Sequence, residues 1–411
     1  MQTITQPYPI ITRTAKETNV GVPQGKKTPA NHTITGRKQR FIRSLIWLNI
    51  LWIAIRTFKN PLFAFEKVKE LKALRSKYRN QRSLSKYVES GKRYFVNFNT
   101  PGWPSVAFSR YVKHYFGRIA ENGADGVYTL VFGITKKCGF QCEHCFEWLN
   151  LNKPETLSRE DLVEIVNRFH SLGVAQVQLS GGEPLNRFQD ILYLLDHAPA
   201  GIDFWLYTSG YSLSQAKAAT LKQHGLTGVI VSLDHHDEEK HNTFRGVKDS
   251  YEKALSAVLH AGEAGLATCF SLCATKEFIS EENLCSYLDL AKQYGVSFIQ
   301  ILEPRAVGHY TGKDVTIAPD QQKMLEQFFE AFNYDPGYTT FPAIAYHSYT
   351  SRQFGCSGGG MDYVYADTDG DIHNCTFCQK KLFSAFDKSF PDKIKQMKTK
   401  GCDAFSSCPS K

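Results

Sequence analysis

Three cysteines lie close together in residues 137–146, separated by three and then by two residues: Cys138, Cys142 and Cys145. This spacing lets one short loop offer three thiolates to a single metal centre. A cubane [4Fe–4S] cluster normally takes four thiolates, so a loop with three leaves one iron open to a substrate or a cofactor. His144 lies inside the same loop and could complete a tetrahedral zinc site instead. The loop alone leaves both metals open.

A repeated pattern begins near residue 127, in which short apolar runs alternate with longer helical patterns. Six such runs predict strands, at residues 127–134, 175–180, 203–208, 228–234, 267–273 and 297–303. Helices are expected between them, at residues 158–172, 188–198, 212–224, 250–264 and 281–294. Strands that alternate with helices pair in parallel through right-handed crossovers. We therefore expect an α/β fold built as a partial (β/α)6 barrel of the TIM type, although periodicity does not separate it from a flat doubly wound sheet.

Ligands bind at the carboxyl ends of the strands in both architectures, so the residues that follow each strand are informative. The first predicted strand leads into the three-cysteine loop. The second is followed by two glycines, a carboxylate and a proline: Gly181, Gly182, Glu183 and Pro184. The glycines permit a close backbone approach, and the carboxylate can accept a hydrogen bond from an ammonium group. The next strands end in short polar side chains, which turns also use for structural reasons: Ser209, Ser232 and Asp234.

The Cys-x3-Cys-x2-Cys spacing with Phe146 directly after it, followed by Gly-Gly-Glu-Pro after the next strand, resembles the radical S-adenosylmethionine (radical SAM) superfamily. The resemblance implies a [4Fe–4S] cluster held by the three cysteines, with the amine and carboxylate of S-adenosylmethionine on the open iron. It also implies reductive cleavage of that cofactor to a 5′-deoxyadenosyl radical. Arg245 would pair with the cofactor carboxylate, and Phe146 would help to keep water from the cluster. The other residues implied in cofactor binding are Gly181, Gly182, Glu183, Pro184, Ser209, Ser232 and Asp234.

Five further cysteines lie near the end of the sequence: Cys356, Cys375, Cys378, Cys402 and Cys408. Residues 363–374 predict a two-stranded hairpin that turns at Asp369 and Gly370 and carries the first two of these cysteines to nearby positions. The pattern resembles the start of SPASM and twitch extensions, which hold auxiliary iron–sulfur clusters in peptide- and protein-modifying radical SAM enzymes. Five thiols suffice for one fully ligated auxiliary cluster but not for two. A zinc-ribbon-like site made from four of them is the alternative.

Charge is unevenly distributed along the 411 residues, whose formal net charge is +9. Residues 37–93 hold sixteen Lys and Arg against three Glu, a net charge of +13, whereas residues 94–411 carry −7. Because the excess is local, we expect no nucleic-acid surface on the body of the protein. Residues 41–55 are apolar, but Arg43 and Asn49 interrupt them and they fall short of the ~20 residues that span a bilayer. They predict either a helix in a membrane interface or a helix packed on the main domain.

The sequence thus predicts four regions: a disordered lead at residues 1–36, a basic amphipathic region at 37–125, a radical SAM core at 126–335 and a SPASM- or twitch-like extension at 336–411. The resemblance implies an enzyme that abstracts a hydrogen atom to oxidise or crosslink a peptide or protein side chain, with an electron donor such as flavodoxin or ferredoxin. The alternatives are dehydrogenation of a sugar- or aminoglycoside-like small molecule and, from another class, a non-catalytic zinc-binding adaptor at the membrane surface. No leading apolar segment with a cleavage site occurs, so we expect a cytoplasmic protein, peripheral at the inner face of the membrane if the basic region binds lipid.

Overall fold

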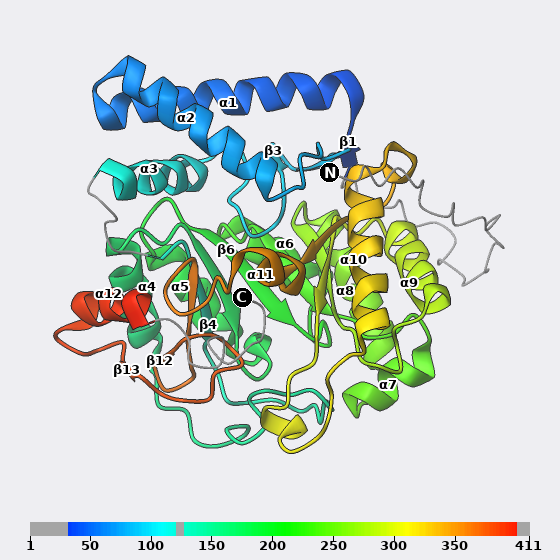
Figure 1. The fold of residues 1–411 in the computed structure, drawn as a ribbon. Helices are drawn as coiled ribbons and strands as arrows, with labels where there is room; N and C mark the ends of the chain where they lie inside the picture. The colour runs from blue at the N-terminus through cyan, green and yellow to red at the C-terminus, as the bar shows by residue number, and fades with distance from the viewer. Residues whose placement is uncertain (1–31, 121–126, 401–411) are drawn as a thin grey trace.

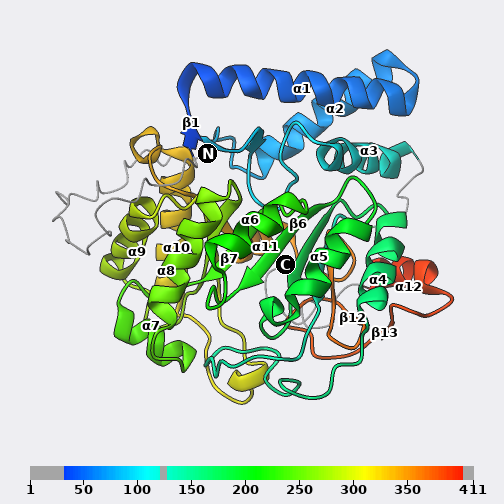
Figure 2. The ribbon, with the colours of Figure 1, turned by 180° about the vertical axis from the view of Figure 1, so that it is seen from behind.

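The computed structural model describes residues 32–120 and 127–400, and Figures 1 and 2 show the fold from opposite sides. Most of the predicted lead, residues 1–31, and the last two cysteines, Cys402 and Cys408, lie outside the described residues. Residues 32–36 do not belong to a disordered lead, because His32–Ile34 form strand β1 and helix α1 begins at Gly36.

A ten-stranded sheet, ordered β10-β9-β8-β7-β6-β5-β4-β11-β12-β13, forms the centre of the described chain. The six predicted strands are all present, as β4 (Thr129–Gly133), β5 (Gln176–Ser180), β6 (Asp203–Thr208), β7 (Gly228–Ser232), β8 (Ala267–Cys273) and β9 (Phe298–Leu302). Neighbours among these six pair in parallel, which confirms the α/β class. The predicted helices are α4 (Arg159–Ser171), α5 (Phe188–His197), α6 (Gln215–Gln223), α8 (Ser250–Glu263) and α9 (Glu281–Gln293). A short helix that was not predicted, α7 (Glu238–Arg245), precedes α8.

The parallel part of the sheet is larger than the predicted (β/α)6 unit. β10 (Ala343–Tyr346) pairs in parallel with β9, and β11 (Tyr363–Ala366) pairs in parallel with β4. β12 (Asp371–His373) and β13 (Phe383–Ser384) continue beyond β11 in antiparallel pairing. The remaining helices of this part are α10 (Pro319–Tyr334), α11 (His347–Phe354) and α12 (Phe390–Lys400). The boundary expected at residue 335 therefore falls inside one continuous sheet, because later strands add to both of its edges.

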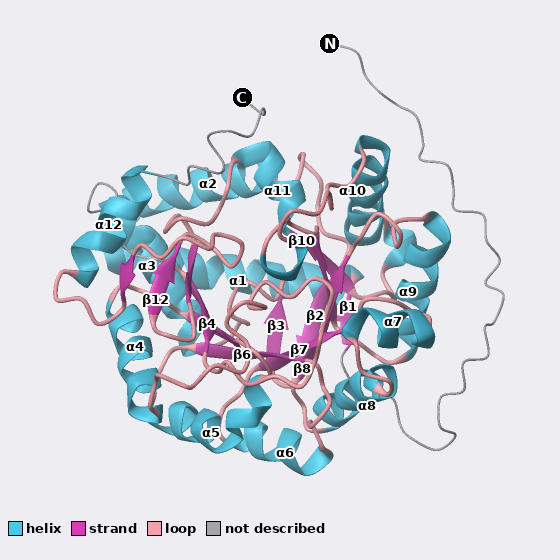
Figure 3. Cartoon of the chain, turned by 90° about the horizontal axis from the view of Figure 1, so that it is seen from below, coloured by secondary structure: helices cyan, strands magenta, loops and turns pink. Residues whose placement is uncertain are grey.

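The sheet is curved, with helices on its outer side (Figure 3). The ring centroids of Trp205 on β6 and Phe298 on β9 are 6.2 Å apart, and Gln300 on β9 donates to the hydroxyl of Tyr207 on β6 at 3.1 Å. β6 and β9 are three positions apart in the strand order, which in a flat sheet would separate them by about 14 Å. These contacts across the concave side favour the partial barrel over the flat sheet. Among the described strands β10 pairs only with β9, so the barrel is open at that edge.

The N-terminal part covers the end of the barrel at which the strands begin (Figures 1 and 2). Helices α1 (Gly36–Phe58), α2 (Pro61–Lys77) and α3 (Val106–Ala120) pack around an apolar cluster of their own. Strands β2 (Tyr87–Ser90) and β3 (Arg93–Phe95) form a hairpin. The rings of Phe95 and Phe98, at its end, contact Trp205 and Phe298 inside the barrel. The barrel interior is thus filled at the end where the strands begin, opposite their carboxyl ends.

Helix α1 is longer than the apolar run that predicted it, because it continues through polar and basic residues at both ends. By length and composition alone it could cross a membrane, and 22% of its apolar stretch of 18 residues is buried. Its inward face consists mainly of branched and small apolar side chains in contact with the N-terminal cluster: Ile42, Ile46, Ile50 and Ala54. One face of this helix is therefore packed on the rest of the protein, as one of the two alternatives expected, while the opposite face is exposed.

Candidate active site

The three-cysteine loop leaves the barrel at the carboxyl end of β4. Asn152 holds its first cysteine, since the Asn152 side chain accepts from the Cys138 N–H at 3.1 Å and donates to the Cys138 carbonyl at 2.9 Å. Cys142 is buried, and Cys138 and Cys145 are partly buried. Burial raises the pKa of the Cys138 thiol to about 11 and that of the Cys145 thiol to about 12. A metal that binds here must therefore displace protons from thiols in a poorly solvated loop.

Gly181 and Gly182 allow the loop after β5 to touch the cysteine loop. A Cβ atom would lie 2.5 Å from the Thr135 carbonyl oxygen if placed on Gly181, and 2.4 Å from the Lys137 carbonyl oxygen if placed on Gly182. The N–H of Gly182 donates to Thr135 at 2.7 Å, and the N–H of Glu183 donates to Lys137 at 2.8 Å. The close backbone approach expected at these glycines therefore occurs against the protein's own cysteine loop.

Gly182→Ala is expected to displace the cysteine loop, because the new methyl group would overlap the Lys137 carbonyl oxygen. Changes in groups that orient metal ligands typically cost 10–100-fold in metal affinity, and we expect a loss of about 10-fold here. Iron and sulfide analysis after anaerobic reconstitution measures this effect. Gly139→Ala is the matched control, since its added Cβ would meet no atom within 4 Å. Equal iron content in the two variants would contradict the prediction.

Glu183 lies in a hydrogen-bond cluster between the ends of β5 and β6. Its carboxylate accepts from the Thr208 hydroxyl at 2.8 Å and the Leu185 N–H at 3.1 Å. The N–H and hydroxyl of Ser209 donate to its other oxygen at 2.7 and 2.6 Å. Pro184 begins the short 3-10 turn that follows. The structure thus joins Glu183 to Ser209, and their contact with a cofactor stays a prediction.

Asp234 and Arg245 form a buried ion pair beside the cysteine loop. Arg245 Nε donates to Asp234 Oδ2 at 2.6 Å, and its Nη1 lies 3.5 Å from the Sγ atom of Cys142. The N–H of Cys273 donates to the other Asp234 oxygen at 2.9 Å. Burial is the largest influence on Asp234 and opposes its charge, but the Arg245 guanidinium together with the other neighbouring groups holds the pKa of this carboxyl below its usual range. Arg245, which the resemblance assigned to the cofactor carboxylate, is engaged here by Asp234 and Cys142, and Ser232 is half-buried at the end of β7.

The segment after β9 is hydrogen-bonded to the cysteine loop, a contact that the sequence analysis missed. The N–H of His309 donates to the Cys145 carbonyl at 2.9 Å, and its Nδ1 lies 2.9 Å from the Cys142 carbonyl. The imidazole of His309 stacks on Trp148, with ring centroids 3.9 Å apart. A Cβ on Gly308 would lie 2.1 Å from the Cys145 carbonyl oxygen. His309 follows Cys142 by 167 positions, so no local pattern could have indicated this contact.

His144, the residue that suggested zinc, packs against α7. Its ring stacks on that of Phe244 with centroids 5.0 Å apart. Burial lowers the pKa of His144 to about 4, which keeps the imidazole neutral at pH 7. Its Nδ1 is buried, and the described residues offer it no hydrogen-bond partner.

The predicted C-terminal hairpin is present as β11 and β12. It brings two of the five late cysteines together at Gly358, where an added Cβ would lie 3.4 Å from Cys356 Sγ and 3.3 Å from Cys375 Cβ. The N–H of Cys378 donates to the Cys375 carbonyl at 3.1 Å. Burial, aided by the two neighbouring thiols, raises the pKa of Cys375 to about 11. Cys356 and Cys375 are therefore brought together as the hairpin predicted, and their role as metal ligands stays a prediction.

The same hairpin contacts the first cysteine loop directly. Lys136 Nζ, before that loop, donates to Asp369 at 2.5 Å. Phe146, after it, meets Tyr365 of β11 edge to face with centroids 5.7 Å apart, and the Tyr365 hydroxyl donates to Glu147. Strand β11 thus connects the two cysteine groups.

The donor sets suit iron–sulfur clusters by chemistry, since each group offers three thiols from one short region. Within residues 32–120 and 127–400, no group of three His, Cys, Asp or Glu side chains stands close enough to hold a metal ion.

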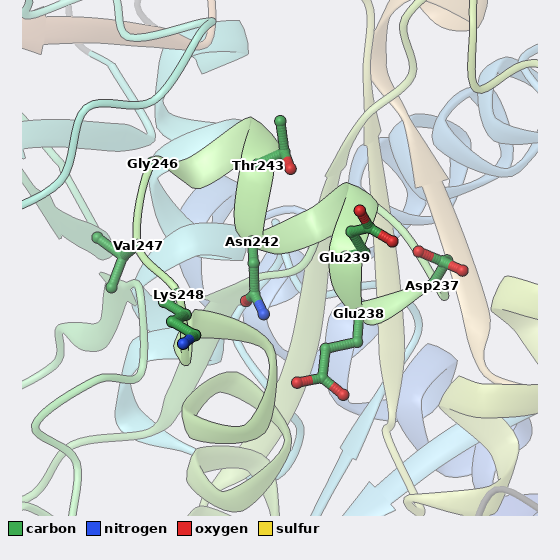
Figure 4. A pocket seen from close by; sticks show the side chains of 8 residues that line it. All are labelled: Asp237, Glu238, Glu239, Asn242, Thr243, Gly246, Val247 and Lys248. Carbon is green, nitrogen blue, oxygen red and sulfur yellow. The ribbon is translucent and has the colours of Figure 1, made fainter.

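A broad hollow of about 680 Å³ runs along α7 and the turn after it, residues 237–248 (Figure 4). Carboxylates of Asp237, Glu238 and Glu239 stand at one end, and Lys248 and Val247 at the other (Figure 4). None of the predicted site residues lines this hollow. It is a feature of α7 and of the turn that follows it, separate from the predicted site residues.

A family model for the radical SAM superfamily matches residues 132–290, the stretch that contains the three cysteines, the Gly-Gly-Glu-Pro segment and the Asp234–Arg245 pair. This stretch of the chain is a radical SAM domain. Enzymes with this domain use a [4Fe–4S] cluster and S-adenosylmethionine as cofactors.

The curated relatives have names that describe different activities. The chain is 32% identical over 180 residues to the GTP 3′,8-cyclase of Aliarcobacter butzleri, covering 41% of this chain and 54% of the relative. It is 26% identical over 280 residues to the mycofactocin maturase MftC of Mycolicibacterium smegmatis, covering 64% and 68%. The chain thus spans about half the length of several curated relatives it matches.

Solved radical SAM structures share the fold at low sequence identity. Streptococcus suis SuiB bound to precursor peptide SuiA aligns with a TM-score of 0.53 and 15% identity, covering 81% of this chain and 78% of SuiB. The enzyme anSMEcpe with bound AdoMet aligns with a TM-score of 0.52 and 17% identity, covering 68% and 87%. These likenesses support the partial-barrel architecture.

Proposed function

We propose that this radical SAM enzyme reductively cleaves S-adenosylmethionine and abstracts a hydrogen atom from a peptide or protein side chain, which it oxidises or crosslinks. The observation that carries the proposal is the loop after β4, which places Cys138, Cys142 and Cys145 at the carboxyl end of the parallel strands. When bound, the cluster supplies the electron that cleaves the cofactor to a 5′-deoxyadenosyl radical. The protein holds that loop from three sides, through the segments after β5, β7 and β9.

Each site residue has a role in this proposal. The three cysteines hold the cluster, and Phe146 excludes water from it. Glu183, fixed by Ser209, orients the cofactor amine, while Gly181, Gly182 and Pro184 shape the turn that presents this carboxylate. Arg245 presents a positive charge to Cys142 from its ion pair with Asp234. Ser232, at the end of β7, faces the ribose or the substrate.

The C-terminal region, from residue 336 onward, holds one auxiliary iron–sulfur cluster in our proposal. Cys356, Cys375 and Cys378 supply three thiolates, and Cys402 or Cys408 supplies the fourth. The contacts of β11 with both cysteine groups support transfer of an electron between them. A small donor such as flavodoxin or ferredoxin delivers the first electron.

The peptide substrate is supported by the relatives and structures whose names mention peptides. MftC is a maturase, SuiB was solved with precursor peptide SuiA, and anSMEcpe with the Cp18Cys peptide. The GTP 3′,8-cyclase relatives favour a small-molecule substrate as the second candidate. The zinc adaptor is set aside, because residues 132–290 match the model of a superfamily of enzymes.

Anaerobic purification of the full chain tests the proposal. We expect a brown protein that contains iron and sulfide and forms 5′-deoxyadenosine when it is reduced with S-adenosylmethionine. Peptides encoded beside its gene are then incubated with it, and mass spectrometry should detect loss of two hydrogen atoms from one of them. A colourless protein with stoichiometric zinc would overturn the cofactor assignment. Formation of 5′-deoxyadenosine without change in any peptide, but with change in a small molecule, would overturn the substrate assignment.

A further inference from the structure

The outer face of α1 and the first turns of α2 expose five large apolar side chains. Their exposed fractions are 63% for Phe41, 62% for Leu48, 55% for Trp52, 85% for Leu62 and 62% for Phe65. Single exposed apolar residues are ordinary, but a contiguous group marks an interaction site. We propose that this face binds the surface of an anionic lipid bilayer, so that the enzyme lies peripherally on a membrane.

The spacing of these residues defines one continuous face. Phe41, Leu48 and Trp52 follow one another at intervals of seven and four, which places them on one side of a helix. That side is opposite the buried stripe of Ile46 and Ile50. Leu62 and Phe65 follow in α2, which begins at Pro61, just after α1 ends at Phe58. Both views of the fold show α1 at the outer edge of the molecule (Figures 1 and 2).

Basic side chains frame this apolar face. Exposed cations on α1, on α2 and between them take part in no ion pair within the described residues: Arg37, Arg40, Arg56, Lys59 and Lys69. The guanidinium of Arg56 lies 4.9 Å from the ring centroid of Trp52. An apolar stripe with aromatic and cationic neighbours matches the boundary between lipid headgroups and acyl chains.

The positive charge of this region favours an anionic bilayer over a second copy of the chain as the partner of this face. Residues 37–93 carry sixteen Lys and Arg against three Glu, and two such faces would repel each other if they met. All three Glu are also paired with lysines, since Glu89 binds Lys38 at 2.6 Å and Lys67 lies 2.7 Å from Glu70 and 4.0 Å from Glu66. An anionic lipid surface offers both the opposite charge and an apolar interior.

The inward contacts of α1 indicate that it lies along the membrane and does not span it. Ile42, Ile46 and Ile50 pack in the cluster with α2 and α3. Trp103, in the segment before α3, donates through its indole N–H to the Asn49 side chain at 3.2 Å. A spanning position would break this packing and expose Asn49 to hydrocarbon.

Vesicle co-sedimentation of the full chain tests the proposal, with phosphatidylcholine alone and with phosphatidylcholine mixed with phosphatidylglycerol. We expect binding to the anionic vesicles only, weakening as salt is raised. The triple variant Phe41→Ser, Leu48→Ser, Trp52→Ser should lower the partition coefficient at least ~10-fold. The charge variant Arg37→Glu, Arg40→Glu, Lys59→Glu should lower it similarly. Val106→Ser, which changes a 69% exposed apolar residue of α3, is the matched control and should bind normally.

Three outcomes would overturn the proposal. They are equal binding to neutral vesicles, membrane association that only detergent reverses, and absence of vesicle binding together with self-association that the triple serine variant abolishes. The triple variant should still form 5′-deoxyadenosine in solution, because none of its changed residues contacts the cysteine loop. A wild-type chain that binds vesicles but forms no 5′-deoxyadenosine would refute the proposed function and leave this inference intact.

Discussion

Changing Cys138, Cys142 and Cys145 together to Ala is expected to reduce 5′-deoxyadenosine formation to the uncatalysed background. The three thiols are the ligands that one loop offers to the cluster, and without a bound cluster no electron reaches the cofactor. The measurement is anaerobic, with chemical reductant and S-adenosylmethionine, followed by mass spectrometry of the nucleoside. Cys285→Ala, on α9, is the control for a cysteine change outside the loop and should retain the activity.

A variant of the C-terminal cysteines is expected to behave differently from the variant of the first cysteine loop. Changing Cys356, Cys375 and Cys378 to Ala should remove about four irons per chain while cofactor cleavage continues. Turnover of the true substrate should stop if the auxiliary cluster accepts an electron from it. Loss of all iron from this variant would contradict two separate metal sites, and unchanged iron content would contradict the auxiliary cluster.

Arg245→Met is expected to lower the free energy of unfolding by about 3–5 kcal/mol, since removing one member of a buried ion pair leaves the other charge uncompensated. Asp234 and Arg245 are both buried, at 4% and 7% exposure, so solvent does little to relieve the unpaired carboxylate. Chemical denaturation of the metal-free protein measures the effect without involving a cluster.

A second change separates charge from packing at this pair. Asp234→Asn combined with Arg245→Met should recover a large part of the lost stability, because no buried charge remains. Arg159→Met removes a guanidinium from an exposed pair with Glu160 and should change stability little. A double variant that is less stable than Arg245→Met alone would show that the Asp234 carboxylate stabilises the fold mainly through its other contacts, such as the one with the Cys273 N–H.

Local patterns in the sequence were sufficient for much of this structure. The strands β4 to β9 were predicted because their buried runs are rich in β-branched residues and bounded by turns. The hairpin at Asp369 and Gly370 was predicted because a left-handed glycine, here with φ of 77°, suits a tight turn. These features depend on residues that are near neighbours in the chain.

Contacts between distant segments could not be predicted in the same way. β10, which pairs with β9, is only four residues long, too short to show a distinctive period in the sequence. Arg245 was assigned to a cofactor, but its partner Asp234 lies eleven positions earlier, and burial of both is a property of the folded barrel. His309 reaches Cys142 across 167 positions. Such pairings arise from tertiary packing and leave no local pattern.

The aromatic residues that fill the barrel at the end where its strands begin constrain how a polypeptide could be modified. Phe95 and Phe98, packed against Trp205 and Phe298, make the interior a dead end. If the substrate is a peptide, as we propose, it could not be threaded through this closed end and would instead offer a terminus, a tight bend or a single long side chain to the end that carries the cysteine loop. In the proposed reaction, product and spent nucleoside would then leave either through the end that carries the cysteine loop or past the open edge of the barrel beside β10.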